Sequence, residues 1–384
     1  MGKCRKAADG LKVRLYERAT GIPDAWNALL PEDHFLRTTT LGIYEQMHLP
    51  DVNYHYALLE SGGVAKAVVY FQVLAIRSYH LNEARLTPFR KKAWQAFTAG
   101  LCPRLLVAGH LFRHDICSFY WSEDVPPFRA YQLYQEAIKA VMRKSGAHAV
   151  LVKDLAEALI PYFQHYAPRY LLLRNDISMS MPVPGHWAGI ADYEKSLKHK
   201  YAQRFRKIRQ HWDGLEIQEL DAEAMHRNAD VVFRLYEQVS ERQPVRLGKL
   251  SAQFLPALKA AHPEQLRVWL LREQNVPVAF FSAWDRGTVF DMFYIGFDYS
   301  RNESLQLYFN ILFFSVEQAI ASGKETLVLG RTALEAKARL GCTPKYLSTF
   351  LFIRNPFVRR IMLQLQQQIT DGEGEWENRH PFKK

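Results

Sequence analysis

The chain has 384 residues, enough for two domains of ordinary size. Apolar residues make up 48% of it and charged residues 23%, a composition that excludes an intrinsically disordered protein. The net charge is +11, and the segment 193–212 alone contributes seven cations and only one acid. Because the excess charge is local, it argues against a general nucleic-acid coat and for one site that binds an anion.

The four cysteines are scattered, and no histidine is spaced to complete a zinc site with them. We therefore expect reduced thiols, no bound metal and a cytoplasmic location. The first residues are basic but lack an apolar run, so no signal peptide is expected. The richest apolar stretch, 305–320, is interrupted by polar side chains, so no transmembrane segment is expected either. Nothing in the sequence indicates an oligomeric state.

In the first half of the chain, hydrophobic periodicity predicts an alternation of strands and helices. The order is a strand over 11–16, a helix over 34–47, a hairpin over 54–76, a less regular region over 77–128, a helix over 130–144, a strand over 149–153, a helix over 155–166 and a strand over 170–181. The turn of the hairpin is Ser61-Gly62-Gly63, a typical hairpin turn sequence. Two prolines and a glycine within 182–185 end this half.

The second half follows the basic segment and is read in the same way. It begins with a strand over 215–220, helices over 222–240 and 251–261, three antiparallel strands within 266–298, a helix over 304–321, a strand over 326–329, a helix over 333–340 and a strand over 346–353. The polar, glycine-containing residues from 370 onward are expected to be loose.

The two halves repeat one another. SGAHAVLVKD (145–154) aligns with SGKETLVLGR (322–331), and PRYLLL (168–173) aligns with PKYLST (344–349) at nearly the same offset. We therefore expect an α/β (α+β layered) fold of two tandem domains, each a mixed sheet flanked by helices. Their predicted bounds are 11–185 for the N-terminal domain with an insertion near 77–128, 193–212 for a basic connector helix, 213–360 for the C-terminal domain and 370–384 for a loose tail.

The basic connector is the first candidate site. Tyr201, Phe205 and Ile208 share one helical face, so that face can pack while the remainder stays basic. Two interpretations of the basic face remain open: it is a clamp for phosphate or another polyanion, or it is an ordinary solvated face. The candidate substrate-binding cations are Lys200, Arg204, Lys207 and, in a loop between later helices where solvation is the simpler interpretation, Arg246 and Lys249.

The segment GRTALEAKARLG, 330–341, is the second candidate, because it directly follows a buried strand. Thr332 can cap the helix, with Glu335 completing a capping box. Arg331 and Lys337 are then expected near the carboxyl edge of the sheet, where open α/β folds bind ligands. The alternative is a well-capped surface helix with a Glu335–Arg339 pair, and the residues alone support both interpretations equally.

IGFDYSRNESLQLY, 295–308, is the third candidate. Polar residues that open a helix place free N–H groups outward, and Asn302 and Ser304 could hold an anionic cofactor there. Ordinary N-capping is the more economical interpretation. Nucleophile-elbow, zincin, Walker and dinucleotide-binding motifs are all absent from the sequence.

The two-copy arrangement, the basic connector and the segment 330–341 together resemble the Fem-type branch of the GNAT acyltransferase superfamily, which includes proteins labelled peptidoglycan-biosynthesis or BioF2-like acetyltransferases. That family carries S-x-x-x-K-x-R-x-x-I-R-K-A between its domains, and SLKHKYAQRFRKI is similar to it. The family motif F-K-x-x-F-G resembles A-K-A-R-L-G here, which maps the functional lysine onto Lys337 and the glycine onto Gly341, with Ala336 in place of phenylalanine.

The resemblance implies direct transfer of an acyl or aminoacyl group to an amine of an anionic or phosphate-bearing acceptor. Such a transfer needs stabilisation of developing negative charge, for which Lys337 and Arg331 are suited, and a proton relay, for which Tyr294 or Asp291 is suited. Acetyltransferases hold coenzyme A with a glycine-rich R/Q-x-x-G-x-G/A loop, which is absent from 299–313. Fem-type proteins also lack this loop and take aminoacyl groups from tRNA. The donor is therefore acyl-CoA or aminoacyl-tRNA, and tRNA is a candidate partner. A non-catalytic module that binds RNA or an anionic surface is the alternative function; the absence of interleaved aromatic residues along the connector favours the transferase.

Overall fold

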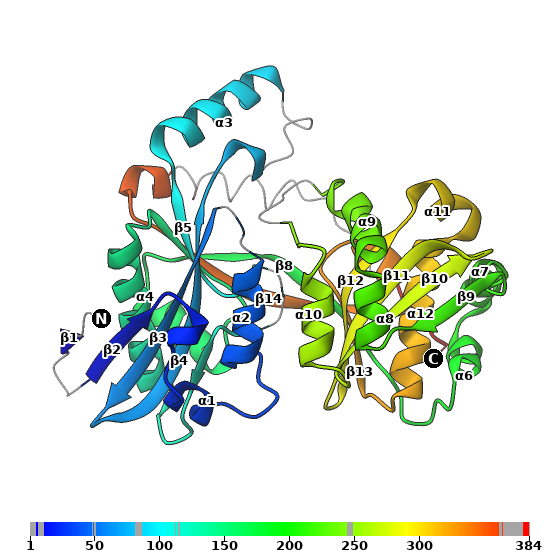
Figure 1. The fold of residues 1–384 in the computed structure, drawn as a ribbon, viewed down its shortest axis with the longest axis horizontal. Coiled ribbons are helices and arrows are strands. Elements are labelled where there is room, and N and C mark those ends of the chain that lie inside the picture. The colour runs from blue at the N-terminus through cyan, green and yellow to red at the C-terminus, as the bar shows by residue number, and fades with distance from the viewer. Residues whose placement is uncertain are drawn as a thin grey trace. The chain divides into compact units, whose positions relative to one another are not determined.

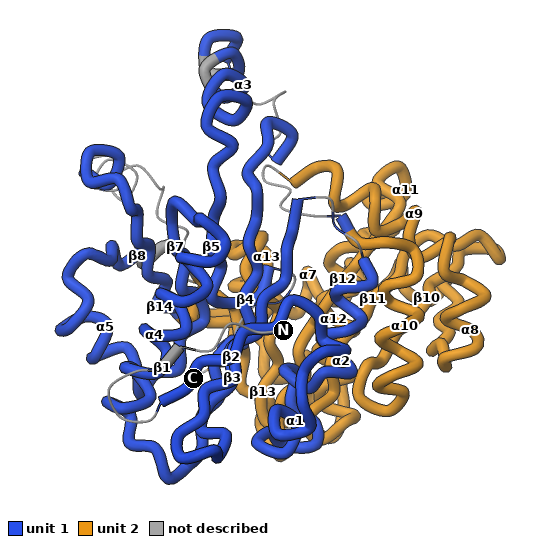
Figure 2. Tube along the Cα trace, turned by 60° about the vertical axis from the view of Figure 1, so that its left-hand side comes forward, with its two compact units in different colours: residues 1–176, 244–249, 346–373 blue, residues 177–243, 250–345, 374–384 orange. Residues whose placement is uncertain are grey.

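The computed structural model describes residues 5–6, 11–47, 49, 51–80, 87–111, 113, 116–243, 249–360, 363 and 379–383. The chain forms two compact units, each assembled from segments that are far apart in sequence (Figure 2). Unit 1 comprises residues 1–176, 244–249 and 346–373, and unit 2 comprises residues 177–243, 250–345 and 374–384. Both units contain a mixed sheet with helices, which confirms the predicted fold class. The predicted domain bounds, 11–185 and 213–360, stay a prediction.

Unit 1 is built on a sheet in which β2, β3, β4 and β5 pair antiparallel in that order and β7 joins β5 in parallel. Its strands are β1 (Arg5–Lys6), β2 (Leu11–Tyr16), β3 (Val52–Ser61), β4 (Val64–Ala75), β5 (Arg104–Ala108), β6 (Phe119–Trp121) and β7 (Ala149–Val152). Its longer helices are α1 (Ala25–Leu29), α2 (Thr38–Gln46), α3 (Pro88–Leu101), α4 (Pro127–Ser145) and α5 (Ile160–Tyr166). The predicted hairpin is confirmed, and Gly62 and Gly63 both take the positive φ that its turn requires.

Helix α4 shows how the sequence produces this packing. Proline at its first position suits the helix start, and Gly146 ends it in the left-handed conformation with φ of 66°. Between these ends, apolar side chains recur at helical spacing and are buried against the sheet. The buried positions on this helix are Ala130, Tyr131, Leu133, Tyr134, Ala137, Ile138 and Val141.

Unit 2 repeats the pattern (Figure 1). Strands β9 (Leu215–Glu219), β10 (Leu266–Glu273), β11 (Val276–Arg286) and β12 (Val289–Phe297) pair antiparallel, and β13 (Thr326–Gly330) joins β12 in parallel. Its helices are α6 (Ile190–Ser196), α7 (His199–Arg209), α8 (Ala222–Arg227), α9 (Ala229–Ser240), α10 (Phe254–Ala261), α11 (Tyr299–Leu305), α12 (Leu307–Ala321) and α13 (Leu334–Ala338). The core lies largely around α12, which is buried along most of its length.

The two repeats exchange their last strands. β8 (Leu171–Pro182) follows β7 in the chain, yet its residues 179–182 pair with β13 of unit 2. β14 (Thr343–Ile353) follows β13, yet its residues 350–353 pair with β7 of unit 1. Each unit is therefore completed by a strand from the other repeat. The aligned sequences at 168–173 and 344–349 lie within or just before these two exchanged strands.

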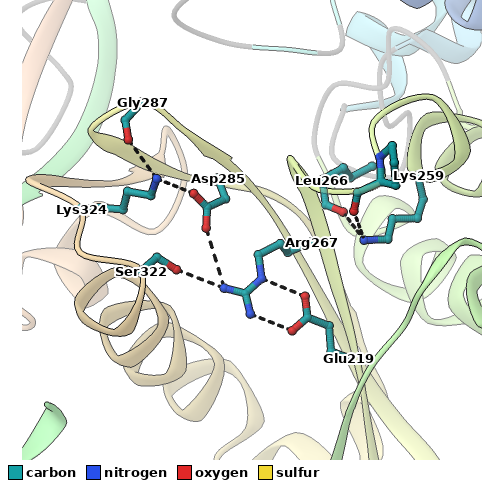
Figure 3. A network of polar contacts seen from close by, with 9 residues as sticks. Glu219, Lys259, Leu266, Arg267, Asp285, Gly287, Ser322 and Lys324 are labelled. Carbon is teal, nitrogen blue, oxygen red and sulfur yellow. Dashed lines mark hydrogen bonds and ion pairs between the residues drawn. The ribbon is translucent and has the colours of Figure 1, made fainter. Parts of the chain in front are cut away.

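A network of charged side chains holds one edge of the unit 2 sheet (Figure 3). Arg267 on β10 donates two hydrogen bonds of 2.8 and 2.7 Å to Glu219 on β9, and a third of 3.1 Å to the hydroxyl of Ser322 after α12. Lys324 forms an ion pair of 2.5 Å with Asp285 on β11. Because these contacts tie three strands to the end of α12, the network has a structural role.

Lys259 lies beside this network and is 5% exposed (Figure 3). Its ammonium donates hydrogen bonds to the carbonyl oxygens of Pro263, at 2.6 Å, and Leu266, at 2.8 Å. Burial lowers its pKa from the ordinary lysine value. This buried lysine is therefore satisfied by backbone acceptors that follow the end of α10.

Two predicted helices are divided in the structure. The stretch predicted as one helix over 304–321 is split by Gln306, which takes the left-handed conformation with φ of 49°. Asp298, rather than a residue at the predicted start, caps α11 by accepting a hydrogen bond from the Ser300 amide. The predicted helix over 222–240 is likewise divided, at Asn228 between α8 and α9. Neither division is marked by glycine or proline, so local sequence did not indicate it.

Candidate functional site

The basic connector forms two helices rather than one. α6 ends at Ser196 and α7 begins at His199, with extended backbone between them. C-terminal residues pair with the backbone at this break: Lys198 donates its amide hydrogen to the carbonyl of Pro381, and the Lys383 amide donates to the carbonyl of Ser196. On α7, Ala202, Phe205 and Ile208 are buried in the unit 2 core. The predicted packing face is therefore confirmed: Phe205 and Ile208 are buried, and Tyr201 is partly buried against the same core.

Residues 379–383 are held in place, in contrast to the loose tail predicted over 370–384. The ring of Phe382 packs against Trp187 and Tyr193, at centroid distances of about 6.0 Å for both. A side chain at Gly341 would place its Cβ 2.2 Å from this ring, and Gly341 has φ of +109°. Glycine at the position matched to the Fem-type motif therefore has a packing reason here. Residues 370–378 lie outside the described part of the chain.

The cations of α7 face a cavity of about 500 Å³ in unit 2. The lining residues are Lys200, Tyr201, Gln203, Arg204, Lys207, Arg339 and Arg379. Lys200, Arg204 and Lys207 were predicted as a set, and the structure brings them together because they recur at i, i+4 and i+7. Arg379 was missed by sequence reasoning, since no local signal connects a tail residue with a helix far back in the chain. We call this hollow the basic cavity.

Ion pairing divides the connector cations into two groups. Three of them are neutralised, in the pairs Lys195–Asp192 (3.1 Å), Arg206–Glu194 (2.6 Å) and Arg209–Glu317 (2.9 Å). Lys200, Arg204 and Lys207 form no ion pair with any described residue. Lys198 also has no ion pair among the described residues but does not line the basic cavity, so three of the four unneutralised connector cations line it.

The opposite wall of the basic cavity carries two arginines that share one acid. Glu335 accepts hydrogen bonds from Arg339, at 2.6 Å, and from Arg379, at 3.1 Å. These bonds lower the pKa of Glu335, so the carboxylate is ionised at neutral pH. Burial and the positive charge of Arg339 lower the pKa of Arg204, whose guanidinium lies 4.8 Å from the Phe309 ring centre. Five cations and one acid therefore meet here, a strong attraction for an anion.

Lys337 lies on α13 and is 1% exposed. Burial lowers the pKa of its ammonium to about 8, an effect that the nearby Cys342 opposes. Burial also raises the pKa of the Cys342 thiol to about 12, so this thiol stays protonated at neutral pH. The Lys337 ammonium makes no hydrogen bond or ion pair with any described residue. A buried, charged and unpaired lysine is costly, and such residues are concentrated at functional sites.

The predicted capping box of α13 is not formed. Ala333 precedes the helix in the left-handed conformation, with φ of 53°, and no side chain caps it. Glu335 is engaged by the two arginines of the basic cavity instead. Arg331 follows β13 and is half-buried, at the strand end where it was predicted.

Tyr294 and Asp291 lie on β12, on the face of the sheet opposite the core cluster that contains the neighbours of Lys337. Phe290 and Met292 point into that cluster, and Asp291 between them points away because side chains alternate along a strand. A register shift between Met292 and Ile295 breaks this alternation, so Tyr294 does not share the face of Met292. Tyr294 packs instead against Tyr236 of α9, with ring centroids 5.7 Å apart. The four predicted catalytic residues are therefore distributed over both faces of the sheet, and their catalytic roles stay a prediction.

The contacts of Asn302 and Ser304 are made within α11 and to the start of α12. The Asn302 side chain accepts a hydrogen bond of 3.0 Å from the Tyr308 amide in the first turn of α12, and Ser304 donates its hydroxyl to the carbonyl of Arg301. Lys249 is exposed, and Arg246 lies outside the described residues. Ligand-binding roles for these four residues stay predictions.

Two kinds of feature are absent from the described residues. No group of three or more histidine, cysteine, aspartate or glutamate side chains there could hold a metal ion. No helix in the same part of the chain is long and apolar enough to cross a bilayer.

No family model matches the chain. Two curated relatives, from two strains of Mycobacterium tuberculosis and both named 8-amino-7-oxononanoate synthase 2, are 27% identical to it over 246 residues. The match covers 61% of this chain but only 30% of each relative. The chain therefore spans less than a third of the length of the curated relatives it matches.

Two solved structures share the fold over nearly the whole chain. FemX has a TM-score of 0.50 at 10% identity, covering 91% of this chain and 98% of FemX. A conserved protein of unknown function from Bacteroides thetaiotaomicron has a TM-score of 0.50 at 9% identity, covering 91% and 99%. The chain thus has the tandem-GNAT fold. FemX is one of the structures that share this fold, which confirms at the level of fold the resemblance predicted from the sequence.

Proposed function

We propose that the chain is a GNAT-type N-acyltransferase whose basic cavity holds the phosphate or another anionic group of a substrate. The observation that carries this proposal is the set of three cations, Lys200, Arg204 and Lys207, that line one cavity without ion-pair partners. The volume of this cavity, about 500 Å³, is in the range of sites that bind small molecules. A small anionic group therefore fits it better than the flat face of a macromolecule would. The tandem-GNAT fold supplies the reaction class.

In the proposed reaction, an acceptor amine attacks the carbonyl carbon of the donor. The bond from that carbon to the thioester sulfur of acyl-CoA, or to the ester oxygen of aminoacyl-tRNA, then breaks, and the new amide forms. The amine nitrogen loses a proton, which the departing sulfur or oxygen takes up. Tyr294 or Asp291 is the proposed relay, and because both lie on the sheet face opposite the neighbours of Lys337, this role is proposed independently of the role of Lys337. Both donors carry phosphates, and the proposal leaves the choice between them to experiment.

Lys337 is proposed to stabilise negative charge, either on the carbonyl oxygen or on a donor phosphate, together with Arg331. With a pKa of about 8, the Lys337 ammonium is mostly protonated at pH 7, as this role requires. One well-placed donor of this kind contributes about 3 kcal/mol, on the order of a hundredfold in rate. The low dielectric of the core strengthens its field, because water does not screen the charge.

The basic cavity is tested by changing Lys200, Arg204 and Lys207 together to alanine. Thermal stabilisation is measured with acetyl-CoA, with aminoacyl-tRNA and with plain RNA, at several salt concentrations. One of the two donors, acetyl-CoA or aminoacyl-tRNA, should stabilise the parent protein, and the triple variant should lose this stabilisation. Any stabilisation that remains in the triple variant should change less with salt concentration than it does in the parent. The matched control changes Lys195, Arg206 and Arg209, whose charges are neutralised by acids, and should retain binding.

The same experiment separates the transferase from the alternative, a non-catalytic module that binds RNA or an anionic surface. Stabilisation by plain RNA equal to that by aminoacyl-tRNA, without amide formation on any amine supplied, would favour the binding module. Unchanged affinity and unchanged salt dependence in the triple variant would remove the basic cavity from the function altogether.

A further inference from the structure

Unit 1 contains a second cavity, of about 670 Å³, that the proposed transfer reaction does not use. This cavity is lined by residues of α4 and of the end of α5, together with Leu11 on β2 and Phe352 on β14. The aromatic lining residues are Phe128, Tyr131, Tyr166, Tyr170 and Phe352. Its volume lies within the range of small-molecule sites.

Phe128, Tyr131 and Tyr166 lie close together in the lining of this cavity, and we call them the aromatic ladder. Phe128 and Tyr166 have ring centroids 5.2 Å apart, and Tyr131 and Tyr166 have centroids 6.2 Å apart. Phe128 is 40% exposed and Tyr166 is 53% exposed. Exposed ring faces at this spacing offer a stacking surface for another planar ring.

Polar groups in the same cavity lack partners. The side-chain nitrogen of Gln135 is inaccessible to solvent and has no hydrogen-bond acceptor among the described residues. Leaving such a donor buried and unpaired costs free energy, which would be recovered if the Gln135 side chain turned its amide toward an acceptor on a ligand. The guanidinium of Arg169, at the rim, also makes no ion pair or hydrogen bond with the described residues.

The charge of the lining is positive. The described lining residues include the cations Arg129, Lys139 and Arg169 and one acid, Glu136, which pairs with Lys139 at 3.0 Å. A ligand that satisfies all these features has a planar ring to stack, an acceptor edge for the Gln135 amide and a negative group for Arg169. An aliphatic chain would satisfy neither the amide nor the cations.

We propose that this cavity of unit 1 binds a nucleoside phosphate, with the base stacked on the Phe128–Tyr166 ladder, its edge bonded to Gln135 and its phosphate near Arg169. This site is independent of the basic cavity, which lies in unit 2. It adds a second ligand to the chain and does not depend on the proposed transfer reaction.

The test is calorimetric titration of the full chain with AMP and UMP, compared with adenosine, which lacks the phosphate, and ribose 5-phosphate, which lacks the base. All titrations are made in the Lys200→Ala, Arg204→Ala, Lys207→Ala background, so that the basic cavity cannot supply the signal. We expect saturable binding of AMP or UMP, weaker binding of adenosine and little binding of ribose 5-phosphate. Salt should weaken the nucleotide but not adenosine.

Three single variants locate the site. Tyr166→Ala should weaken nucleotide binding about tenfold, because base stacking is lost. Gln135→Leu should weaken nucleotide and adenosine alike, and Arg169→Gln should weaken only the nucleotide. The controls are Tyr346→Ala, an aromatic residue of unit 1 that is 63% exposed and does not line the cavity, and Arg143→Gln, an exposed cation of α4 also outside it.

The proposal fails if neither nucleotide binds at millimolar concentration in that background. It also fails if binding is saturable but unaffected by Tyr166→Ala and Gln135→Leu, because the nucleotide would then occupy another site. Self-association of the chain that is abolished by Tyr166→Ala, with no nucleotide binding, would identify the aromatic ladder as an interface between copies and overturn the proposal.

Discussion

Lys337→Met is expected to make the protein more stable at neutral pH while it impairs transfer. The Lys337 ammonium has a pKa of about 8 in the folded chain, against 10.5 for an ordinary lysine. At about 1.4 kcal/mol per pH unit, this gap means that burial of the charge costs about 3 kcal/mol. Methionine keeps the length and the apolar stem, and such volume-conserving changes usually cost less than about 1.5 kcal/mol. The net gain at pH 7 is therefore about 2 kcal/mol.

The stability cost of the Lys337 charge should decrease as the pH rises. Because the folded pKa lies below the unfolded value, the cost is fully present below pH 8 and is relieved as the pH rises from 8 to 10.5. Denaturant unfolding of both proteins at pH 7 and pH 10 measures the difference in the free energy of unfolding. The gain from Lys337→Met should be large at pH 7 and mostly gone at pH 10.

Lys259→Met is the matched control. This lysine is also buried, but its ammonium is bonded to two backbone carbonyl oxygens. Its removal leaves those acceptors without their donor, so Lys259→Met should lower the free energy of unfolding by about 1–3 kcal/mol. If Lys337→Met destabilises the protein at pH 7, or changes stability equally at both pH values, the Lys337 charge is compensated in the folded state and the reasoning is refuted.

Three further predictions follow from contacts described above. If the Lys337 ammonium is required for transfer, the rate should fall as the pH rises through about 8, and Lys337→Met should lose this falling limb in a pH–rate profile. Gly296→Ala should destabilise the protein by about 2 kcal/mol or more, because the new Cβ would lie 2.4 Å from the backbone of α9, whereas Gly185→Ala, with open space around it, should be nearly neutral in the same unfolding assay. Phe382→Ala should cost about 2 kcal/mol and lower the melting temperature, since it removes the ring that packs on Trp187 and Tyr193; a variant as stable as the parent would mean that residues 379–383 contribute nothing to unit 2.

The sequence predicted most elements of regular periodicity and the internal repeat, because alternation and helical spacing are local properties. The strand over 11–16 and the hairpin around Gly62 and Gly63 are examples. Breaks that coincide with distant contacts were not predictable. The division between α6 and α7 coincides with amide bonds to residues 381–383, and nothing within the connector itself signals it.

The candidate site was predictable in part for the same reason. Lys200, Arg204 and Lys207 recur at helical spacing, so their common direction follows from the sequence once α7 is known. Arg379 joins them only through the tertiary fold, by way of its bond to Glu335. The sequence likewise gives no sign that Lys337 is buried without a partner, because that depends on how the whole of unit 2 packs.

The exchange of β8 and β14 has a consequence for the newly made chain. Val152 on β7 pairs with Phe350 on β14, so the sheet of unit 1 keeps an unpaired edge until about 200 more residues have been added. At about 5–20 residues per second, that edge waits on the order of 10–40 s during synthesis. An unpaired strand edge is a template for aggregation. Synthesis that stalls before Ile353 should therefore yield an insoluble product, even though the N-terminal repeat is complete in sequence.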